Sequence, residues 1–371
     1  MIRAGFSILP RRKTIKATQK LHDIGQSIWL DNLTRGLLAS GKLREYIDEF
    51  SVTGLTSNPT IFDHAISNGY DYDGAIRQKQ KEGKAGEELF FELAIEDLRE
   101  AADLFRPIHI RTNGVDGWVS LEVSPLLAWN ADGTLAAAKA LHARAGRPNL
   151  FIKIPGTSAG LLAIEEAIFA GVPFNVTLLF SAAQYLAAAE AYLRGIERRI
   201  AAGLNPNVRS VASLFFSRWD VAVKDKVPER LRNKLGIAVA SEAYEKYRAL
   251  LDSPRWQRIL SAGAHSQRLL WASTGAKDPN TSQLLYVQAL AKPFTVNTMP
   301  ELILKALAAH DEFGDALHGD ADAMLTEFAK VDIDTDRLAS ELLGEGIESF
   351  GKSWRDLLTC IASKAERLKA A

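Results

Sequence analysis

The chain has 371 residues, 45 basic and 45 acidic side chains, a formal net charge of zero, and 47% hydrophobic residues. This balance argues against a general surface for nucleic acid or anionic membranes, and the apolar content excludes wholesale disorder. Cys360 is the only cysteine, which excludes an internal disulfide and a thiolate metal site. No apolar stretch is long enough to span a membrane, so the cytoplasm is the expected location.

The N-terminal segment is strongly basic. Residues 1–20 carry six Lys and Arg side chains and no acidic one. They lack the apolar region and the small-residue cleavage site of a secretory signal, and an organelle transit peptide is the less favoured reading. We expect residues 1–20 to form a poorly ordered basic arm ahead of a single domain, residues 21–371.

Short apolar segments alternate with helical patterns along the chain. Eight segments have strand character: Ser27–Asp31, Gly54–Ser57, Trp118–Val123, Leu150–Ile154, Phe174–Leu179, Arg209–Phe216, Leu269–Ser273 and Phe294–Thr298. Helical patterns between them include Glu87–Phe105, Thr134–Ala145, Gly160–Ala170, Ala182–Ala202 and Gly236–Leu251. Eight such units predict a parallel sheet closed into a (β/α)8 barrel of the TIM type. No strand is followed by a Gly-x-Gly-x-x-Gly fingerprint, which weakens a doubly wound alternative.

The segment after the eighth strand is predicted to be helical. Apolar residues recur there at helical spacing over Ala323–Ala329, Thr335–Leu343 and Ser353–Leu368. We expect these additional C-terminal helices to pack across the barrel.

Lys153 is the most informative residue of the chain. It interrupts the apolar strand Leu150–Ile154, and lysine is seldom fully buried without a partner. Burial disfavours the charged form of an amine, and the neutral amine is a nucleophile toward carbonyl groups. The alternative is a structural lysine that reaches solvent or pairs with an acid.

Other polar residues lie near the carboxyl ends of the predicted strands, where barrel enzymes place their catalytic groups. They include Asp31, Glu122, Asn175 and Thr177, which would converge with Lys153 on one cavity. One amine with two carboxyl groups suits imine chemistry, since the acids can move the protons. Strand-end caps and ion pairs, such as Lys153 with Glu122, are the structural alternative. The seven His residues show no metal-ligand spacing.

Taken together, these segments resemble the transaldolase family, in its long-chain group. The resemblance runs from about Leu21 to the C-terminus, and its motifs occur in the family's order: Gly25–Asn32, Gly54–Phe62, Val119–Pro125, Ile152–Thr157, Asn175–Ser181, Val211–Ser213 with Ser217 and Arg218, Leu270–Gly275 and Thr295–Pro300. The stretch His109–Asn113 is unusual for the family, and we assign no role to it.

The resemblance implies a metal-free transfer of a dihydroxyacetone unit between sugar phosphates in the pentose phosphate pathway, without a cofactor. Lys153 matches the Schiff-base lysine, and Asp31 matches the acid/base at the donor C4 hydroxyl. Glu122 and Thr177 match the pair that handles a catalytic water. Matches to substrate-binding residues are Asn58 and Asn175 for the dihydroxyacetone hydroxyls, Ser213 and Arg218 for phosphate, and, more loosely, Lys277 for phosphate.

Two other functions stay open at this point. An aldolase on the same barrel would use the same lysine but release free dihydroxyacetone. A sugar-phosphate-binding barrel without catalysis would keep Ser213 and Arg218 but has no need of Lys153 or Asp31. Phosphorylated sugars are the expected partners, with no nucleic acid or membrane. The sequence is compatible with a monomer or a homodimer.

Overall fold

The computed structural model describes residues 15–276, 278, 280–312 and 320–370. Eight strands form one parallel sheet in the order β2-β1-β8-β7-β6-β5-β4-β3. Their bounds are β1 Ser27–Asp31, β2 Val52–Thr56, β3 Val119–Glu122, β4 Leu150–Pro155, β5 Phe174–Leu179, β6 Ser210–Phe215, β7 Gln267–Ala272 and β8 Val296–Met299. Each overlaps a predicted strand, and β1 and β5 have the predicted bounds.

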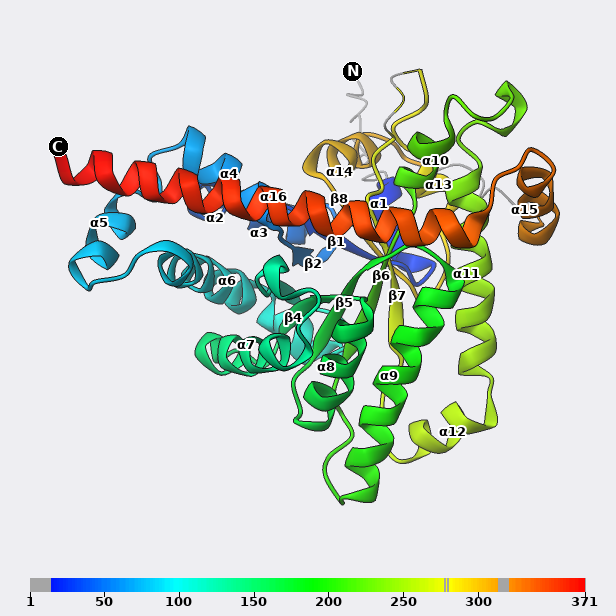
Figure 1. Cartoon of the computed structure of the whole chain (residues 1–371), viewed down its shortest axis with the longest axis horizontal. Coiled ribbons are helices and arrows are strands. Elements are labelled where there is room, and N and C mark those ends of the chain that lie inside the picture. Colours follow the sequence, from blue (N-terminus) through cyan, green and yellow to red (C-terminus); the bar gives the residue numbers. More distant parts are fainter. Residues whose placement is uncertain (1–14, 277, 279, 313–319, 371) are drawn as a thin grey trace, which may run out of the picture.

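Helices follow most of the strands (Figure 1). Those up to β5 are α1 Ala17–Asp23, α2 Arg35–Ala39, α3 Lys42–Glu49, α4 Pro59–Asn68, α5 Asp73–Lys81, α6 Gly86–Arg111, the 3-10 turn η1 Pro125–Leu127, α7 Ala131–Ala145 and α8 Ser158–Phe169. The later ones are α9 Ala182–Ala201, α10 Ser217–Val223, η2 Glu229–Leu231, α11 Leu235–Leu251, α12 Pro254–Ser261, α13 Leu285–Ala289, α14 Glu301–Ala308, α15 Ala321–Ala329 and α16 Thr335–Ala370. The predicted (β/α)8 barrel with C-terminal helices is confirmed.

Backbone hydrogen bonds between β2 and the two residues before β3 close the sheet. The Gly117 amide donates to the Thr53 carbonyl at 2.8 Å, and the Leu55 amide donates to the Trp118 carbonyl at 2.9 Å. Closure removes the two edges that an open sheet would leave exposed. Every second side chain of each strand therefore points into one enclosed interior.

Aromatic rings fill the middle of this interior. The rings of Trp118 and Phe151 stack with centroids 3.9 Å apart, and Trp29 stacks on Phe151 at 6.2 Å. Gly54 makes room for them, since a Cβ there would lie 2.7 Å from Trp29 Nε1 and 2.8 Å from the Trp118 carbonyl oxygen. The absence of a side chain on β2 is thus a packing requirement of the barrel.

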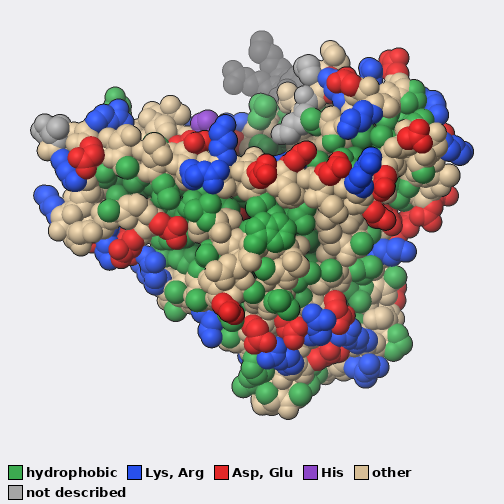
Figure 2. Space-filling view, viewed as in Figure 1, with side chains coloured by type: hydrophobic (Ala, Val, Ile, Leu, Met, Phe, Trp, Pro, Cys, Tyr) green, Lys and Arg blue, Asp and Glu red, His purple; other side chains and the backbone are tan. Residues whose placement is uncertain are grey.

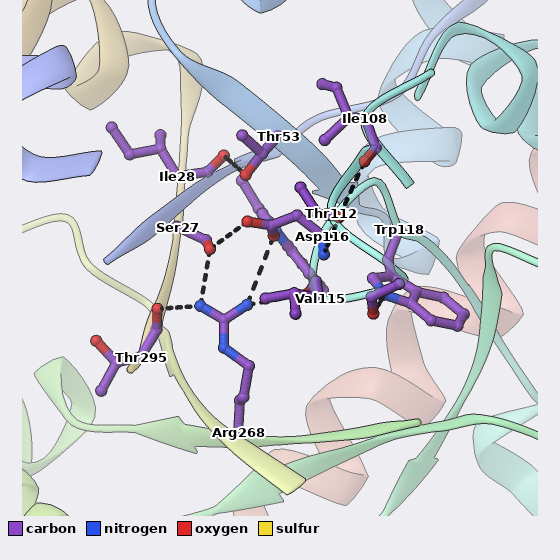
Figure 3. A network of polar contacts seen from close by, with 12 residues as sticks. Ser27, Ile28, Thr53, Ile108, Thr112, Val115, Asp116, Trp118, Arg268 and Thr295 are labelled. Carbon is purple, nitrogen blue, oxygen red and sulfur yellow. Dashed lines mark hydrogen bonds and ion pairs between the residues drawn. The ribbon is translucent and has the colours of Figure 1, made fainter. Parts of the chain in front are cut away.

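A buried ion pair blocks the amino end of the barrel (Figure 3). Asp116 accepts hydrogen bonds from the Ser27 hydroxyl and the Trp29 indole, and lies 3.6 Å from an Arg268 guanidinium nitrogen. Arg268 also donates to Ser27 Oγ and to the Thr295 carbonyl, both at 2.7 Å. These bonds link β1, β7 and the segments before β3 and β8, so they hold four parts of the barrel rim together.

The C-terminal segment differs from the prediction. The expected helices Thr335–Leu343 and Ser353–Leu368 are one 36-residue helix, α16, which contacts α4, α5, α6 and β5. Figure 1 shows it in red, running across the width of the molecule. The helix continues through glycines at 344, 346 and 351, although glycine disfavours a helix interior. Gly346 instead allows close packing, because a Cβ there would lie 3.1 Å from Leu178 and 3.4 Å from Arg218.

The predicted N-terminal arm differs in part as well. Residues 17–20, which we assigned to it, belong to α1, where the Ala17 amide donates to the His310 carbonyl at 2.8 Å. Residues 1–14 lie outside the described residues. Over the face shown in Figure 2, acidic and basic side chains are interspersed, in line with the zero net charge.

Replacing Gly54 by alanine should destabilise the barrel, since the added methyl must push Trp29 or the Trp118 backbone away. Overpacking of this kind costs about 1–3 kcal/mol. Chemical denaturation of Gly54→Ala should give a lower midpoint than the wild type. Gly74→Ala is the matched control, because no atom lies within 4 Å of a Cβ at that helical position. Equal stability of Gly54→Ala and wild type would contradict this packing role.

Candidate active site

A cavity of about 300 Å³ lies at the carboxyl ends of the strands. Six of the nine site residues predicted from the sequence line it: Asp31, Asn58, Lys153, Thr177, Ser213 and Arg218. Glu122 and Asn175 are buried beside Lys153 on the neighbouring strands. Lys277 lies outside the described residues. The closed barrel therefore brings together eight residues that the sequence spreads over nearly 190 positions, from 31 to 218.

Lys153 lies at the centre of this group. Its Nζ is 3.2 Å from Glu122 Oε2 and donates to the Ser57 carbonyl at 3.3 Å. The residue is only 4% exposed, yet it reaches the cavity. In the strand register Lys153 is opposite Glu122 on one side and Asn175 on the other. The ion pair of Lys153 with Glu122, which the sequence offered as a purely structural role for the lysine, is therefore present. It joins two residues of the same candidate site.

Glu122 is a carboxyl group in an apolar setting. Burial raises its pKa, the charge of Lys153 partly offsets this, and the charge of Asp31 raises the pKa further. A carboxyl group with a raised pKa holds a proton more readily than a free one does, which suits a group that donates protons. Its Oε2 is within ion-pair distance of Lys153 but lacks the alignment of a hydrogen bond. Thr177 Oγ1, also buried, has no hydrogen-bond partner among the described residues.

Two threonines orient Asp31. The Thr56 hydroxyl donates to Asp31 Oδ1 at 2.8 Å, and the Thr298 hydroxyl lies 2.7 Å from Thr56 Oγ1. Because Thr56 donates to the carboxylate, Thr298 is placed to donate to Thr56. This chain of hydroxyl groups fixes the Asp31 carboxylate at the cavity wall, where it can accept a proton from a bound molecule.

The two asparagines have different surroundings. Asn58 caps α4, since its side-chain oxygen accepts from the Ile61 amide at 3.1 Å. This bond fixes Asn58 at the cavity wall and leaves its NH2 group for a ligand. Asn175 is buried, donates to Ser120 Oγ at 3.2 Å and accepts from the Ser213 hydroxyl at 2.6 Å. Ser213 is thus tied to the interior row that contains Lys153 and Asn175.

Arg218 gives the cavity a cationic side chain in addition to Lys153. It stands on the first turn of α10, half-buried, with its guanidinium 5.7 Å from the Phe215 ring. Burial lowers its pKa, and the charge of Glu345 partly offsets that effect. Among the described residues its guanidinium makes no hydrogen bond or ion pair within 4 Å. Its planar donor fork suits the oxygens of a phosphate group.

The comparisons with known proteins agree with this geometry. Residues 28–361 match the family model described as "Transaldolase/Fructose-6-phosphate aldolase". The chain belongs to this family.

Relatives extend over nearly the whole chain. A transaldolase of Arthrobacter sp. is 42% identical over 92% of this chain and 95% of its own length. One of Thermobifida fusca is 42% identical over 93% and 97%, and "Transaldolase 2" of Nostoc punctiforme is 38% identical over 94% and 97%. The family resemblance inferred from the motifs is confirmed.

The sequence did not predict that α16 contributes to the cavity. Ser349 and Phe350 line it, and the Phe350 ring lies 5.7 Å from Lys153 Nζ. No motif marks these residues, since their spacing on α16 is that of an ordinary packed helix. Thr56 and Thr298 could have been found, because both lie on strand ends and point inward with Asp31 and Trp29.

The described residues contain neither a metal-binding cluster nor a membrane-spanning helix. Among the described residues, no group of three or more His, Cys, Asp or Glu side chains could hold a metal ion. Within the same ranges, no helix combines the length and apolar character needed to cross a membrane.

Asp220 anchors the helix that carries Arg218. It accepts from the Leu235 amide at 3.0 Å and from the Tyr286 hydroxyl at 2.7 Å, so it joins α10 to α11 and α13. Burial raises its pKa to about 6, and these hydrogen bonds partly counter that rise. Gly236 faces this carboxyl group, where a Cβ would lie 2.9 Å from Asp220 Oδ2.

Asp220 should make stability depend on pH. Its folded-state pKa is raised to about 6, so its contribution to stability is complete below about pH 4 and is lost as pH rises through 6. The free energy of unfolding of the wild type, relative to Asp220→Asn, should fall by up to about 3 kcal/mol over this range. Denaturation of both proteins between pH 4 and 7.5 measures it. A difference independent of pH would contradict the assignment.

Proposed function

We propose that this chain is a transaldolase that transfers a dihydroxyacetone unit from a ketose phosphate to an aldose phosphate through an imine on Lys153. The observation that carries the proposal is a buried primary amine that reaches the cavity and has a carboxyl group 3.2 Å away. Membership of the family and the transaldolase names of its relatives support the reaction. No cofactor is needed for this chemistry, since the electron sink is the imine itself.

Imine formation uses the groups around Lys153. The amine adds to the C2 carbonyl of the donor, and the resulting carbinolamine loses its hydroxyl group as water. Glu122 donates the proton that this departure requires and takes one back when the imine is hydrolysed. A water molecule between Glu122 Oε2 and the unpartnered Thr177 hydroxyl would satisfy both buried oxygens and relay these protons.

Carbon–carbon cleavage is assigned to Asp31. Its carboxylate removes the proton of the C4 hydroxyl group, the C3–C4 bond breaks, and the electron pair moves into the protonated imine as an enamine. The aldose phosphate leaves. The enamine then attacks the aldehyde carbon of a second aldose phosphate, and Asp31 returns the proton to the new hydroxyl group. The Thr56 and Thr298 hydroxyls hold Asp31 in one orientation through both steps.

The remaining lining residues bind the substrate. Asn58 offers its NH2 group to the dihydroxyacetone hydroxyls, and Asn175 and Ser213 lie in the same interior row as Lys153. Arg218 binds the terminal phosphate, because its guanidinium lacks an anionic partner within 4 Å among the described residues. Lys277 stays a predicted phosphate contact from the sequence.

An aldolase that releases dihydroxyacetone is the second candidate, since the matching family model includes both activities. Phe350 of α16 favours transfer. Its ring lines the cavity 5.7 Å from Lys153 Nζ, and an apolar surface at this position would limit the access of water to the enamine carbon. Turnover of fructose 6-phosphate that depends on an added acceptor aldose supports transfer, whereas release of dihydroxyacetone without acceptor supports the aldolase. The pentose phosphate pathway, a cytoplasmic location and the oligomeric state stay predictions from the sequence.

Lys153→Arg should abolish turnover, because a guanidinium keeps the charge but is too weak a nucleophile to form the imine at a useful rate. Treating the wild type with fructose 6-phosphate and borohydride should leave a reduced dihydroxyacetone adduct on Lys153, located by peptide mass spectrometry. Lys364 is an internal control, since it is similarly buried and also pairs with an acid, Asp73, but does not line the cavity. Folded wild type without an adduct would refute the imine mechanism.

Arg218→Gln should weaken the use of phosphorylated donors. We expect kcat/KM for fructose 6-phosphate to fall about tenfold or more, as for loss of a charge-assisted hydrogen bond, while kcat/KM for unphosphorylated fructose changes little. Steady-state assays with both sugars give the ratio, and Arg218→Lys should recover part of it. Equal losses with the two sugars would point to a structural role for Arg218.

A further inference from the structure

A second cavity, of about 550 Å³, lies at the opposite end of the barrel. It is formed by segments that lead into β3, β4, β5 and β6, and the mechanism above does not use it. The last turn of α6 and the turn after it, which include the His109–Asn113 stretch left without a role, supply part of its wall. Its lining includes Ile110, Trp118, Pro148, Pro173 and the basic residues His109, His142 and Arg209. Its volume is that of a site for a small organic molecule.

The described lining carries positive charge and no carboxylate. Arg209 donates to Asn207 Oδ1 at 3.1 Å and to the Asn113 carbonyl, and neither partner is an anion. Two of its three nitrogens thus have neutral partners, and Nη1 makes no hydrogen bond within the described residues. Burial lowers its pKa to about 10, and the nearby charge of Arg268 acts in the same direction. Asp116 does not compensate this charge, because it is paired with Arg268.

His109 lies next to this guanidinium. A Cβ on Gly114 would be 3.4 Å from His109 Cε1 and 3.5 Å from both Nε and Nη2 of Arg209, so both side chains border the same space beside the bare backbone of Gly114. His109 Nδ1 is 3.2 Å from the Asp116 carbonyl oxygen, which fixes the ring. Burial lowers the His109 pKa, and the charges of Arg106 and Arg209 lower it further. Two cationic or potentially cationic groups thus converge without an anion between them.

We propose that this cavity binds a small organic anion, a phosphorylated or carboxylated metabolite, whose anionic group is held by Arg209 and by the protonated, imidazolium form of His109. Ile110, Pro148 and Pro173 provide apolar surface for its carbon skeleton. An anion at this position would supply the partner that Arg209 lacks, and an arginine fork binds phosphate or carboxylate oxygens in pairs. The site is separate from the Arg218 site at the other end of the strands.

Trp118 gives a direct signal of occupancy. Its indole nitrogen donates to the Gly114 carbonyl at 2.9 Å, and its ring is edge-on to His109 with centroids 4.7 Å apart. Figure 3 shows Trp118 on the side of the rim network away from Ser27. An anion bound by His109 and Arg209 must change the environment of this indole group. Its N–H resonance is therefore a suitable probe, assigned by its loss in Trp118→Phe.

The test uses the full chain carrying Arg218→Gln, which removes the expected phosphate site of the active cavity. Inorganic phosphate and citrate are titrated separately while the Trp118 indole N–H resonance is followed. We expect a saturable shift with at least one of them, and the responding probe tells phosphate from carboxylate chemistry. Adding Arg209→Gln should weaken binding about tenfold or more. Arg230→Gln is the matched control, since Arg230 is exposed and pairs with Glu327.

The proposal is overturned if neither anion gives a saturable shift, or if the affinity survives Arg209→Gln in a protein that keeps its near-UV circular dichroism. If Arg209→Gln does not fold, His109→Gln decides: a similar loss of affinity supports the site, and an unchanged affinity overturns it. Activity of the parent chain with intact Arg218 is measured in parallel, so a failure of the proposed reaction is recorded separately from a failure of this site.

Discussion

The barrel holds a primary amine and a carboxyl group 3.2 Å apart in its interior, where Lys153 is 4% and Glu122 is 5% exposed. Removing two such charges from water is costly, and their mutual attraction recovers only part of that cost. The arrangement persists because the strand register holds both residues in one row, between the aromatic layer and the cavity. The polar groups nearby follow from this constraint: Ser57, Asn175 and Thr177 give the interior the hydrogen-bonding capacity that a buried ion pair needs.

The polar groups described at the two ends of the barrel differ in their partners. At the amino end, Asp116 and Arg268 are paired and hydrogen-bonded, so they contribute to the rigidity of the rim. At the carboxyl end, Thr177 and Arg218 are left without such partners among the described residues. Two residues at strand ends there, Leu178 and Ser273, have left-handed φ values of 58° and 62°, which costs of order 1–3 kcal/mol each. Residues with left-handed φ and buried groups without a partner also occur in other parts of the described chain, and these members of the two sets lie beside the cavity.

Helix α16, near the C-terminus, completes the cavity that the barrel strands begin. It brings Phe350 to the amine, and Gly346 lets it approach Leu178 and Arg218 closely. Gly346 and Phe350 lie more than 120 positions after Arg218 in the sequence. Packing against α4, α5 and α6 supports the helix through its three glycines, where local propensity alone favours a break. The apolar surface beside Lys153 is thus positioned by long-range packing.

The sequence by itself determined the alternation of strands and helices, the eight-stranded barrel, and which polar residues stand at strand ends, because strand periodicity and buried lysine are local signals. It also determined family membership, since the motifs occur in a fixed order. Only the tertiary structure decided that Tyr286 and the Leu235 amide hold Asp220, that α16 is continuous, and that His109 and Arg209 both lie beside Gly114. These depend on distances between segments far apart in the chain, and side-chain type or spacing along the sequence carries no record of such distances.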